Sequence, residues 1–284
     1  MFDLHRHTWF SKATGPLASL ATLRSFGMAL FDTIWSIYLF AFLASEALVG
    51  VYSGAFTLTI AALFIFTTPL LERYDETRLW KLTILGILTG FLLFSLATQL
   101  WMVIIISIAW VIVYSLEFQT SSVLIRSTAN GEDLGRTEAL TYVLKNFAYM
   151  TGPLLGGFLL EVLGVRWVFV FAAGFLGLAI LHFRRQSWPI INHENSHNSP
   201  LRNFRSYFTD ASRRHAYVMN AGLALFWGII YTYIPLYVIR SGMPEGWVGF
   251  ALFAVAFPIV TFGYFAGEWA DRGYFRQLFS IGFA

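Results

Sequence analysis

Long apolar stretches separated by short polar segments dominate this sequence. A helix of about 20 predominantly apolar residues is long enough to cross the hydrocarbon core of a bilayer. Such stretches lie near residues 22–44, 47–71, 82–98, 101–125, 139–160, 167–183, 216–239 and 247–266. The pattern predicts an all-α integral membrane protein with eight transmembrane helices, and the apolar run from Leu278 predicts the start of a ninth.

Composition supports a membrane protein and narrows its chemistry. Hydrophobic residues make up 57% of the 284 positions and charged residues 12%, whereas soluble chains have about 25% charged residues. The chain has no cysteine, which excludes disulfides, thiol catalysis and Cys-ligated metal sites. It also has no glycine-rich phosphate-binding loop, so ATP-driven transport has no support. We expect no cofactor, no nucleic-acid partner and a monomer in the lipid bilayer.

Positive charges predict the orientation. Of the 19 Lys and Arg residues, 16, including Arg24, fall in segments on the same side as the N-terminus. Arg166 and Arg240 fall on the opposite side, and Lys145 lies within a span. Because Lys and Arg concentrate in cytoplasmic loops, we expect a cytoplasmic N-terminus and a location in the cell membrane.

One long polar loop divides the chain. Residues 1–183 form a predicted N-terminal half of six helices, 184–214 a basic cytoplasmic linker, and 215–284 an incomplete C-terminal half. From Ser199, a potential N-cap, apolar residues recur at helical spacing through Ala211. This pattern predicts an interfacial amphipathic helix, with a plain flexible linker as the alternative.

Short matches suggest an internal repeat. Residues 28–31 correspond to 223–226 at an offset of 195, and Glu46 corresponds to Glu245 at an offset of 199. Residues 72–73 correspond to 271–272, again at 199. Because six spans separate the copies, both have the same orientation, an arrangement found in one class of secondary transporters.

The loop after the second span resembles a family signature. Residues 70–78 (Leu-Leu-Glu-Arg-Tyr-Asp-Glu-Thr-Arg) are similar to the G-x-L-a-D-R-x-G-R-K motif of the major facilitator superfamily, and residues 267–272 resemble its second copy. The first copy departs from the motif at Thr68, Glu72 and Asp75. The resemblance implies a conformational latch formed by Glu72, Arg73, Arg78, Gly267, Asp271 and Arg272. Simple anchoring of the inner helix ends by positive charge is the alternative.

A second motif lies in the fifth span. Gly152, Pro153, Gly156 and Gly157 form a Gly-Pro-Leu-Leu-Gly-Gly sequence that is similar to the GPxxGG motif of proton-coupled antiporters in that superfamily. The glycines allow a neighbouring helix to approach closely, and the proline permits bending. Ordinary packing of small residues is the alternative interpretation.

Ionisable residues within spans are costly and are candidates for function. We expect Asp32, Glu117 and Lys145 to take part in proton coupling, although Asp32 as a static core residue and a purely structural Glu117–Lys145 pair remain alternatives. Their similar depth on consecutive spans predicts that pair. We also expect a substrate cavity. It would be lined by Ser25 and Ser36 on a polar face of the first span, by Asn220, Trp227 and Tyr231 on the repeat-related face of the seventh, and by Tyr114 on the face of Glu117.

A zinc-protease motif occurs in the linker. Residues 193–197 fit H-E-x-x-H, which binds zinc when both histidines share one face of a helix. The flanking Asn, Ser and Pro residues disfavour a helix, and no third ligand follows. We interpret the match as coincidence and expect neither a metal nor enzymatic activity.

These features predict a proton-coupled secondary transporter that exports a small organic solute by alternating access. A proton symporter importing a nutrient is the alternative within that class, and a non-transporting receptor or scaffold is the alternative outside it. A membrane zinc hydrolase has only the 193–197 match in its favour. The repeat period further predicts a complete chain of roughly 400 residues with twelve spans, so we expect this chain to be truncated at its C-terminus.

Overall fold

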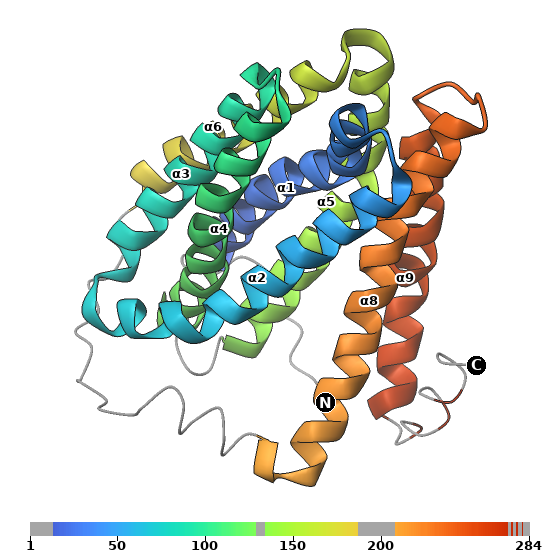
Figure 1. The fold of residues 1–284 in the computed structure, drawn as a ribbon. Helices are drawn as coiled ribbons and strands as arrows, with labels where there is room; N and C mark the ends of the chain where they lie inside the picture. Colours follow the sequence, from blue (N-terminus) through green and yellow to red (C-terminus); the bar gives the residue numbers. More distant parts are fainter. Residues whose placement is uncertain are drawn as a thin grey trace.

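A computed structural model describes residues 14–128, 134–186 and 208–271, together with residues 274, 277 and 280. The described parts of the chain consist of helices joined by short turns (Figure 1). The helices are α1 (Thr14–Leu43), α2 (Glu46–Arg73), α3 (Glu76–Leu96), α4 (Leu100–Thr128), α5 (Leu134–Leu163), α6 (Val165–Arg184), α8 (Ala211–Arg240) and α9 (Trp247–Asp271).

Six of the described helices are long and apolar enough to cross a membrane. They are α1, α3, α4 and α6 over their full lengths, α2 over residues 46–64 and α8 over residues 213–240. In α5, Glu138, Lys145 and Glu161 interrupt the apolar sequence, and the apolar part of α9 is shorter, at residues 247–262. The all-helical class is therefore confirmed, whereas the count of eight spans and a ninth stays a prediction.

Helix α1 lies at the centre of the bundle, in contact with α5 and α6 on one side and with α8 on another. A Cβ atom added to Gly27 would lie 2.9 Å from the carbonyl oxygen of Ala172, so the glycine is needed for the close approach of α6. Phe31 stacks on Phe91 and Trp110, with ring centroids 5.1 and 5.0 Å apart. These buried aromatic rings fix α1 against α3 and α4.

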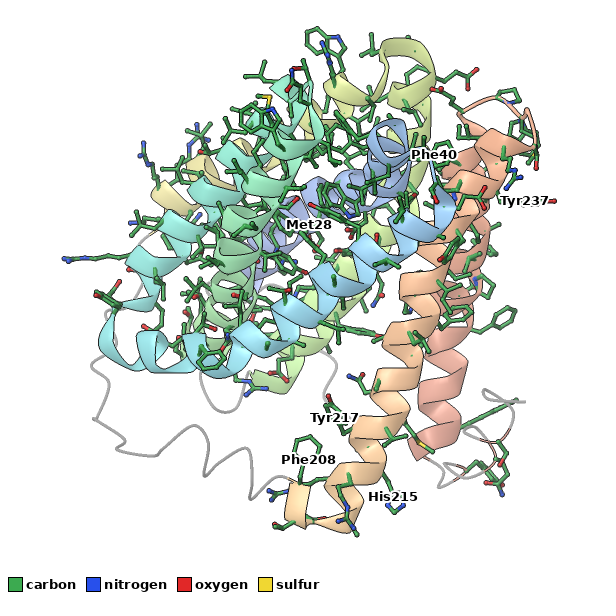
Figure 2. All side chains as sticks on the ribbon, viewed as in Figure 1. Met28, Phe40, Phe208, His215, Tyr217 and Tyr237 are labelled. Carbon is green, nitrogen blue, oxygen red and sulfur yellow. The ribbon has the colours of Figure 1, made fainter. Side chains whose placement is uncertain are left out.

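Helices α8 and α9 meet the first six helices at one end, which we call the closed end (Figure 1). This end carries the turn at 44–45 between α1 and α2 and the turn at 241–246 between α8 and α9. Leu236 and Val238 of α8 are buried there, whereas residues 213–226 of the same helix are exposed. Figure 2 shows Tyr237 near the closed end and Tyr217 and His215 far from it.

Part of the predicted linker lies outside the described residues. Helix α6 ends at Arg184, within one residue of the expected boundary of the first half, and α8 begins at Ala211. The 193–197 match and most of the predicted interfacial helix fall between residues 187 and 207, which the structure does not describe. The division of the chain at 184–214 stays a prediction.

Candidate functional site

Arg24 of α1 and Glu117 of α4 form an ion pair inside the helix bundle. Nη2 of Arg24 donates to Oε2 of Glu117 at 2.5 Å, and Nε lies 3.0 and 3.1 Å from the two carboxylate oxygens. The hydroxyl of Ser121 donates to Oε1 of Glu117 at 2.5 Å, and Nε1 of Trp80 donates to that hydroxyl at 3.0 Å. The Glu117 side chain is fully buried, so these donors replace the water that it has lost.

This pair corrects two expectations. The sequence places Arg24 among the residues at the inner helix ends, but the structure buries it within α1, where the side chain is 10% exposed. The sequence also predicts that Glu117 pairs with Lys145, and the structure gives Glu117 the guanidinium of Arg24 instead. The similar depth of Glu117 and Lys145 along their helices correctly indicated that they lie near each other. Depth does not specify which helix a side chain faces, and therefore which partner it binds.

Lys145 nevertheless lies close to this pair. It is half-buried on α5 and lines a small cavity of about 70 Å³ together with Arg24, Trp80 and Ser121. Among the residues that the structure describes, it has no ion-pair or hydrogen-bond partner. Glu117 and Lys145 therefore lie in one region, but in two different electrostatic settings.

Asp32 lies two helical turns from Arg24 along α1, about 12 Å at 1.5 Å per residue, where α1 meets α5 and α8. Tyr149 on α5 and Arg24 both lie close enough to the Asp32 carboxyl to act on it electrostatically. Tyr231 of α8 is also within electrostatic range of Asp32. The sequence reasoning missed Tyr149, although its position one turn after Lys145 on α5 places both on one helix face.

The predicted cavity residues fall into three groups. Tyr231 and Trp227 are half-buried on α8, with ring centroids 5.8 Å apart, and the ring of Tyr114 lies 5.9 Å from the Arg24 guanidinium carbon. Ser25 is fully buried in the core, Ser36 is 1% exposed and Asn220 is exposed. Tyr114 and Tyr231 thus lie near charged residues, with Trp227 beside Tyr231, whereas Ser25 and Ser36 face packed helices.

The Gly-Pro-Leu-Leu-Gly-Gly motif of α5 packs against two helices. Cβ atoms added to Gly152 and Gly156 would lie 2.7 Å from Ala29 and 3.2 Å from Thr33, both in α1. A Cβ atom on Gly157 would lie 2.7 Å from the amide nitrogen of Gly249 in α9. The motif therefore allows α5 to pack tightly against the centre of the bundle and against α9.

Polar contacts join the two parts at the closed end. Nη1 of Arg240 in α8 donates to Oε1 of Glu46 in α2 at 2.7 Å. The amide of Gly246, just before α9, donates to Oε2 of Glu161 in α5 at 3.0 Å. The hydroxyl of Ser36 donates to the carbonyl of Tyr231 at 3.3 Å. Sequence reasoning did not identify Glu161, which carries no motif signal.

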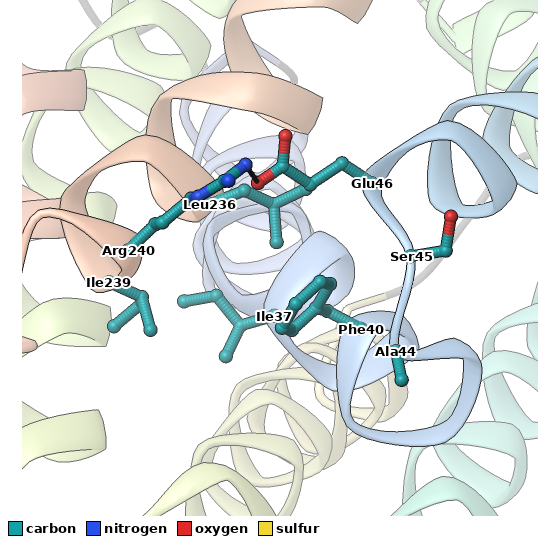
Figure 3. A pocket seen from close by; sticks show the side chains of 8 residues that line it. All are labelled: Ile37, Phe40, Ala44, Ser45, Glu46, Leu236, Ile239 and Arg240. Atoms are coloured by element: carbon teal, nitrogen blue, oxygen red, sulfur yellow. Dashed lines mark hydrogen bonds and ion pairs between the residues drawn. The ribbon is translucent and has the colours of Figure 1, made fainter.

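The Glu46–Arg240 pair borders a pocket of about 450 Å³ (Figure 3). Ile37 and Phe40 of α1 form one wall, and Leu236 and Ile239 of α8 contribute the other apolar side chains. Figure 3 shows the ion pair extending from one part of the protein to the other beside these apolar groups. The exposed Glu46–Arg240 pair therefore links α2 to α8. The pocket beside it separates part of the apolar surface of α1 from that of α8.

The predicted latch is described only in part. Four of its residues, Glu72, Arg73, Gly267 and Asp271, have a helical backbone. The side chains of Glu72, Arg73 and Asp271 and the whole of Arg272 lie outside the described residues.

At the start of α3, Asp75 is the N-cap and accepts a hydrogen bond from the amide of Arg78 at 2.8 Å. The hydrogen bond from the Thr77 hydroxyl lowers the pKa of the Asp75 carboxyl from its usual value. Burial opposes this effect, and the hydrogen bond from the Arg78 amide adds to it. Asp75 thus replaces the motif glycine with a helix cap.

No group of three His, Cys, Asp or Glu residues lies in a metal-binding arrangement within the ranges described above. The predicted coincidence at 193–197 stays a prediction, because those residues are outside the described ranges.

Comparison with known proteins identifies the fold. The sequence profile of the Major Facilitator Superfamily matches residues 17–284. The chain is similar to a crystal structure of the peptide transporter POT in complex with sulfate, with a TM-score of 0.54 and 12% identity over 81% of this chain and 50% of that one. It is also similar to a POT family transporter in complex with 5-aminolevulinic acid, with a TM-score of 0.53 and 11% identity over 80% and 47% of the chains. The chain thus spans about half the length of these structures. A comparison with curated proteins finds no match.

Proposed function

Because the chain belongs to the Major Facilitator Superfamily, we propose that it exports a small organic solute by proton-coupled alternating access. Its family and fold are those of membrane transporters and not of enzymes. The direction of transport, the coupling ion and the solute class are our proposals. The position of Asp32, the contacts at the closed end and the packing of the Gly-Pro-Leu-Leu-Gly-Gly motif support them.

The position of Asp32 carries the proposal. Its carboxyl lies on α1 between Tyr149 of the first six helices and Tyr231 of α8. A proton bound to this carboxyl changes its interactions with both parts, so proton binding is linked to their relative position. Glu117 is less suited to this role, because two nitrogens of the Arg24 guanidinium and the Ser121 hydroxyl already donate to its oxygens.

The contacts at the closed end support an inward-facing state. The proposed orientation places the N-terminus in the cytoplasm, so the end bearing Glu46 and Arg240 faces outward. The exclusion of Arg24 from the inner segments leaves the asymmetry of positive charge intact. The ion pair, the bond from Gly246 to Glu161 and the contact of Gly157 with Gly249 then close the outer side.

Asp32→Asn tests the coupling. In proteoliposomes containing the full-length protein, adding solute is expected to change the fluorescence of an internal pH-sensitive dye, and the variant is expected to lose this solute-dependent proton flux. Glu138→Gln is the matched control, because it also removes one carboxylate but lies in an exposed pair with Arg126. Undiminished proton flux in Asp32→Asn would remove Asp32 from the mechanism.

The direction of coupling requires a separate measurement. Export by antiport predicts that solute accumulates in the compartment with the higher proton concentration, whereas import by symport predicts accumulation in the other compartment. The packing of Gly152, Gly156 and Gly157 on two helices favours the antiport interpretation through its likeness to the antiporter motif. A chain that binds solutes without moving them would instead be a receptor or scaffold.

A further inference from the structure

Lys145 has a different environment from the other buried charges. Glu117 accepts hydrogen bonds from two nitrogens of Arg24 and from Ser121, so its oxygens are occupied. Lys145 lies on the neighbouring helix α5, near both charges of that pair. Two cations and one carboxylate leave this group of three residues with a net charge of +1. One further anionic group would neutralise it.

The cavity beside Lys145 has polar and apolar sides. Its volume of about 70 Å³ is enough for a few water molecules, each of which needs about 10–15 Å³ of such space. Lys145, Arg24 and Ser121 form the polar side, and Leu17, Leu20 and Leu124 are among the apolar residues. A small amphiphilic ligand matches this lining better than a fully hydrated ion, since its apolar part can cover the leucines.

We propose that Lys145 binds the carboxylate of an organic anion, whose aliphatic end enters the cavity against Leu17, Leu20 and Leu124. A cation in a low-dielectric site gains a strong charge-assisted hydrogen bond from a carboxylate, which also offsets the cost of its burial. A single negative charge neutralises the group, whereas a dianion would leave an excess negative charge among buried residues. The proposal rests on the transport function above and specifies a monocarboxylate as the solute class.

Equilibrium binding tests this proposal without any flux measurement. The purified chain is placed in nanodiscs of zwitterionic lipid and titrated with butyrate, with its uncharged analogue butyramide and with sulfate. Saturable butyrate binding, at least about tenfold tighter than that of either other compound, is expected from one charge-assisted contact. Equal binding of butyramide or of sulfate would overturn the proposal, as would the absence of butyrate binding at millimolar concentrations.

Variants then assign the binding to Lys145. Lys145→Gln is expected to weaken butyrate binding about tenfold or more and to leave butyramide binding unchanged, and Lys145→Arg is expected to restore most of the affinity. Lys81→Gln is the matched control, because Lys81 is exposed on α3, over the ring of Phe183, and does not line the cavity. Unchanged butyrate affinity in folded Lys145→Gln would overturn the assignment. Binding without solute flux would instead contradict the transport proposal alone.

Discussion

Removing one partner of the Arg24–Glu117 pair is expected to lower the stability of the protein strongly. We consider Glu117→Gln, which keeps the shape of the side chain and removes its charge. The substitution leaves the guanidinium of Arg24 without its carboxylate, in a position where only 10% of that side chain is exposed. The loss comes mainly from this uncompensated charge, because a buried pair as a whole is often close to neutral for stability.

The structure allows the size of the effect to be compared with a second pair. Removing one partner of a buried pair costs about 3–5 kcal/mol in the free energy of unfolding, and the bidentate contact of Nε with Oε1 and of Nη2 with Oε2 supports that range. Arg126 and Glu138 are 72% and 49% exposed and 3.5 Å apart. Breaking that pair with Glu138→Gln is expected to cost about 0–1 kcal/mol.

The assay is reversible unfolding of the purified chain in mixed detergent micelles, followed by tryptophan fluorescence. Arg24→Gln, Glu117→Gln and the double variant form a thermodynamic cycle. The double variant is expected to be more stable than the sum of the single losses predicts, by about 2 kcal/mol or more, since it leaves neither charge alone. If Glu117→Gln cost no more than Glu138→Gln, or if the losses were additive, the reasoning would be wrong.

Two further predictions follow from backbone geometry. Gly157→Ala is expected to weaken the packing of α5 against α9 and to lower the proposed transport by the full-length protein several-fold, because its Cβ would lie 2.7 Å from the amide nitrogen of Gly249. Gly54→Ala is the control, because its Cβ meets open space. Equal transport rates in the two variants would contradict this prediction. Asp75→Ala is expected to lower stability by about 1 kcal/mol through loss of the α3 cap. The folded-state pKa of Asp75 is lowered, so its electrostatic contribution is complete above the unfolded pKa of about 3.9 and is lost as pH falls through the folded value. Thermal melts across acid pH should therefore show a smaller pH dependence in Asp75→Asn, which keeps the cap, and an unchanged dependence would refute the assignment.

The fold class could be predicted from the sequence because apolar length is the main requirement for crossing a bilayer. The motif of Gly152, Gly156 and Gly157 also predicted close packing, which the structure shows against Ala29, Thr33 and Gly249. These features depend on spacing along one helix, and a sequence reports such spacing directly.

The partners of the buried charges were harder to predict because they depend on the rotation of one helix relative to another. Glu117 and Lys145 have similar depth, yet Glu117 faces α1 and binds Arg24. Arg24 itself was assigned to an inner helix end because the apolar span was predicted to begin near residue 22, whereas α1 begins at Thr14, ten residues before Arg24. Glu46 and Arg240 are nearly 200 positions apart, so their contact required the structure.

The contact of Ser36 with Tyr231 has a mechanical consequence for the proposed cycle. The two residues are 195 positions apart, which is the offset of the predicted repeat, so that repeat makes them equivalent positions in contact with each other. Displacement in a rigid rotation grows with distance from the pivot, and this contact is a point where α1 and α8 touch directly. Asp32, one helical turn from Ser36, lies close to this contact, so in the proposed cycle a small rotation of α8 changes the direction from which Tyr231 faces its carboxyl. Arg240, about 14 Å further along α8 than Tyr231, lies at the end of the lever arm, where the same rotation is large enough to separate an ion pair.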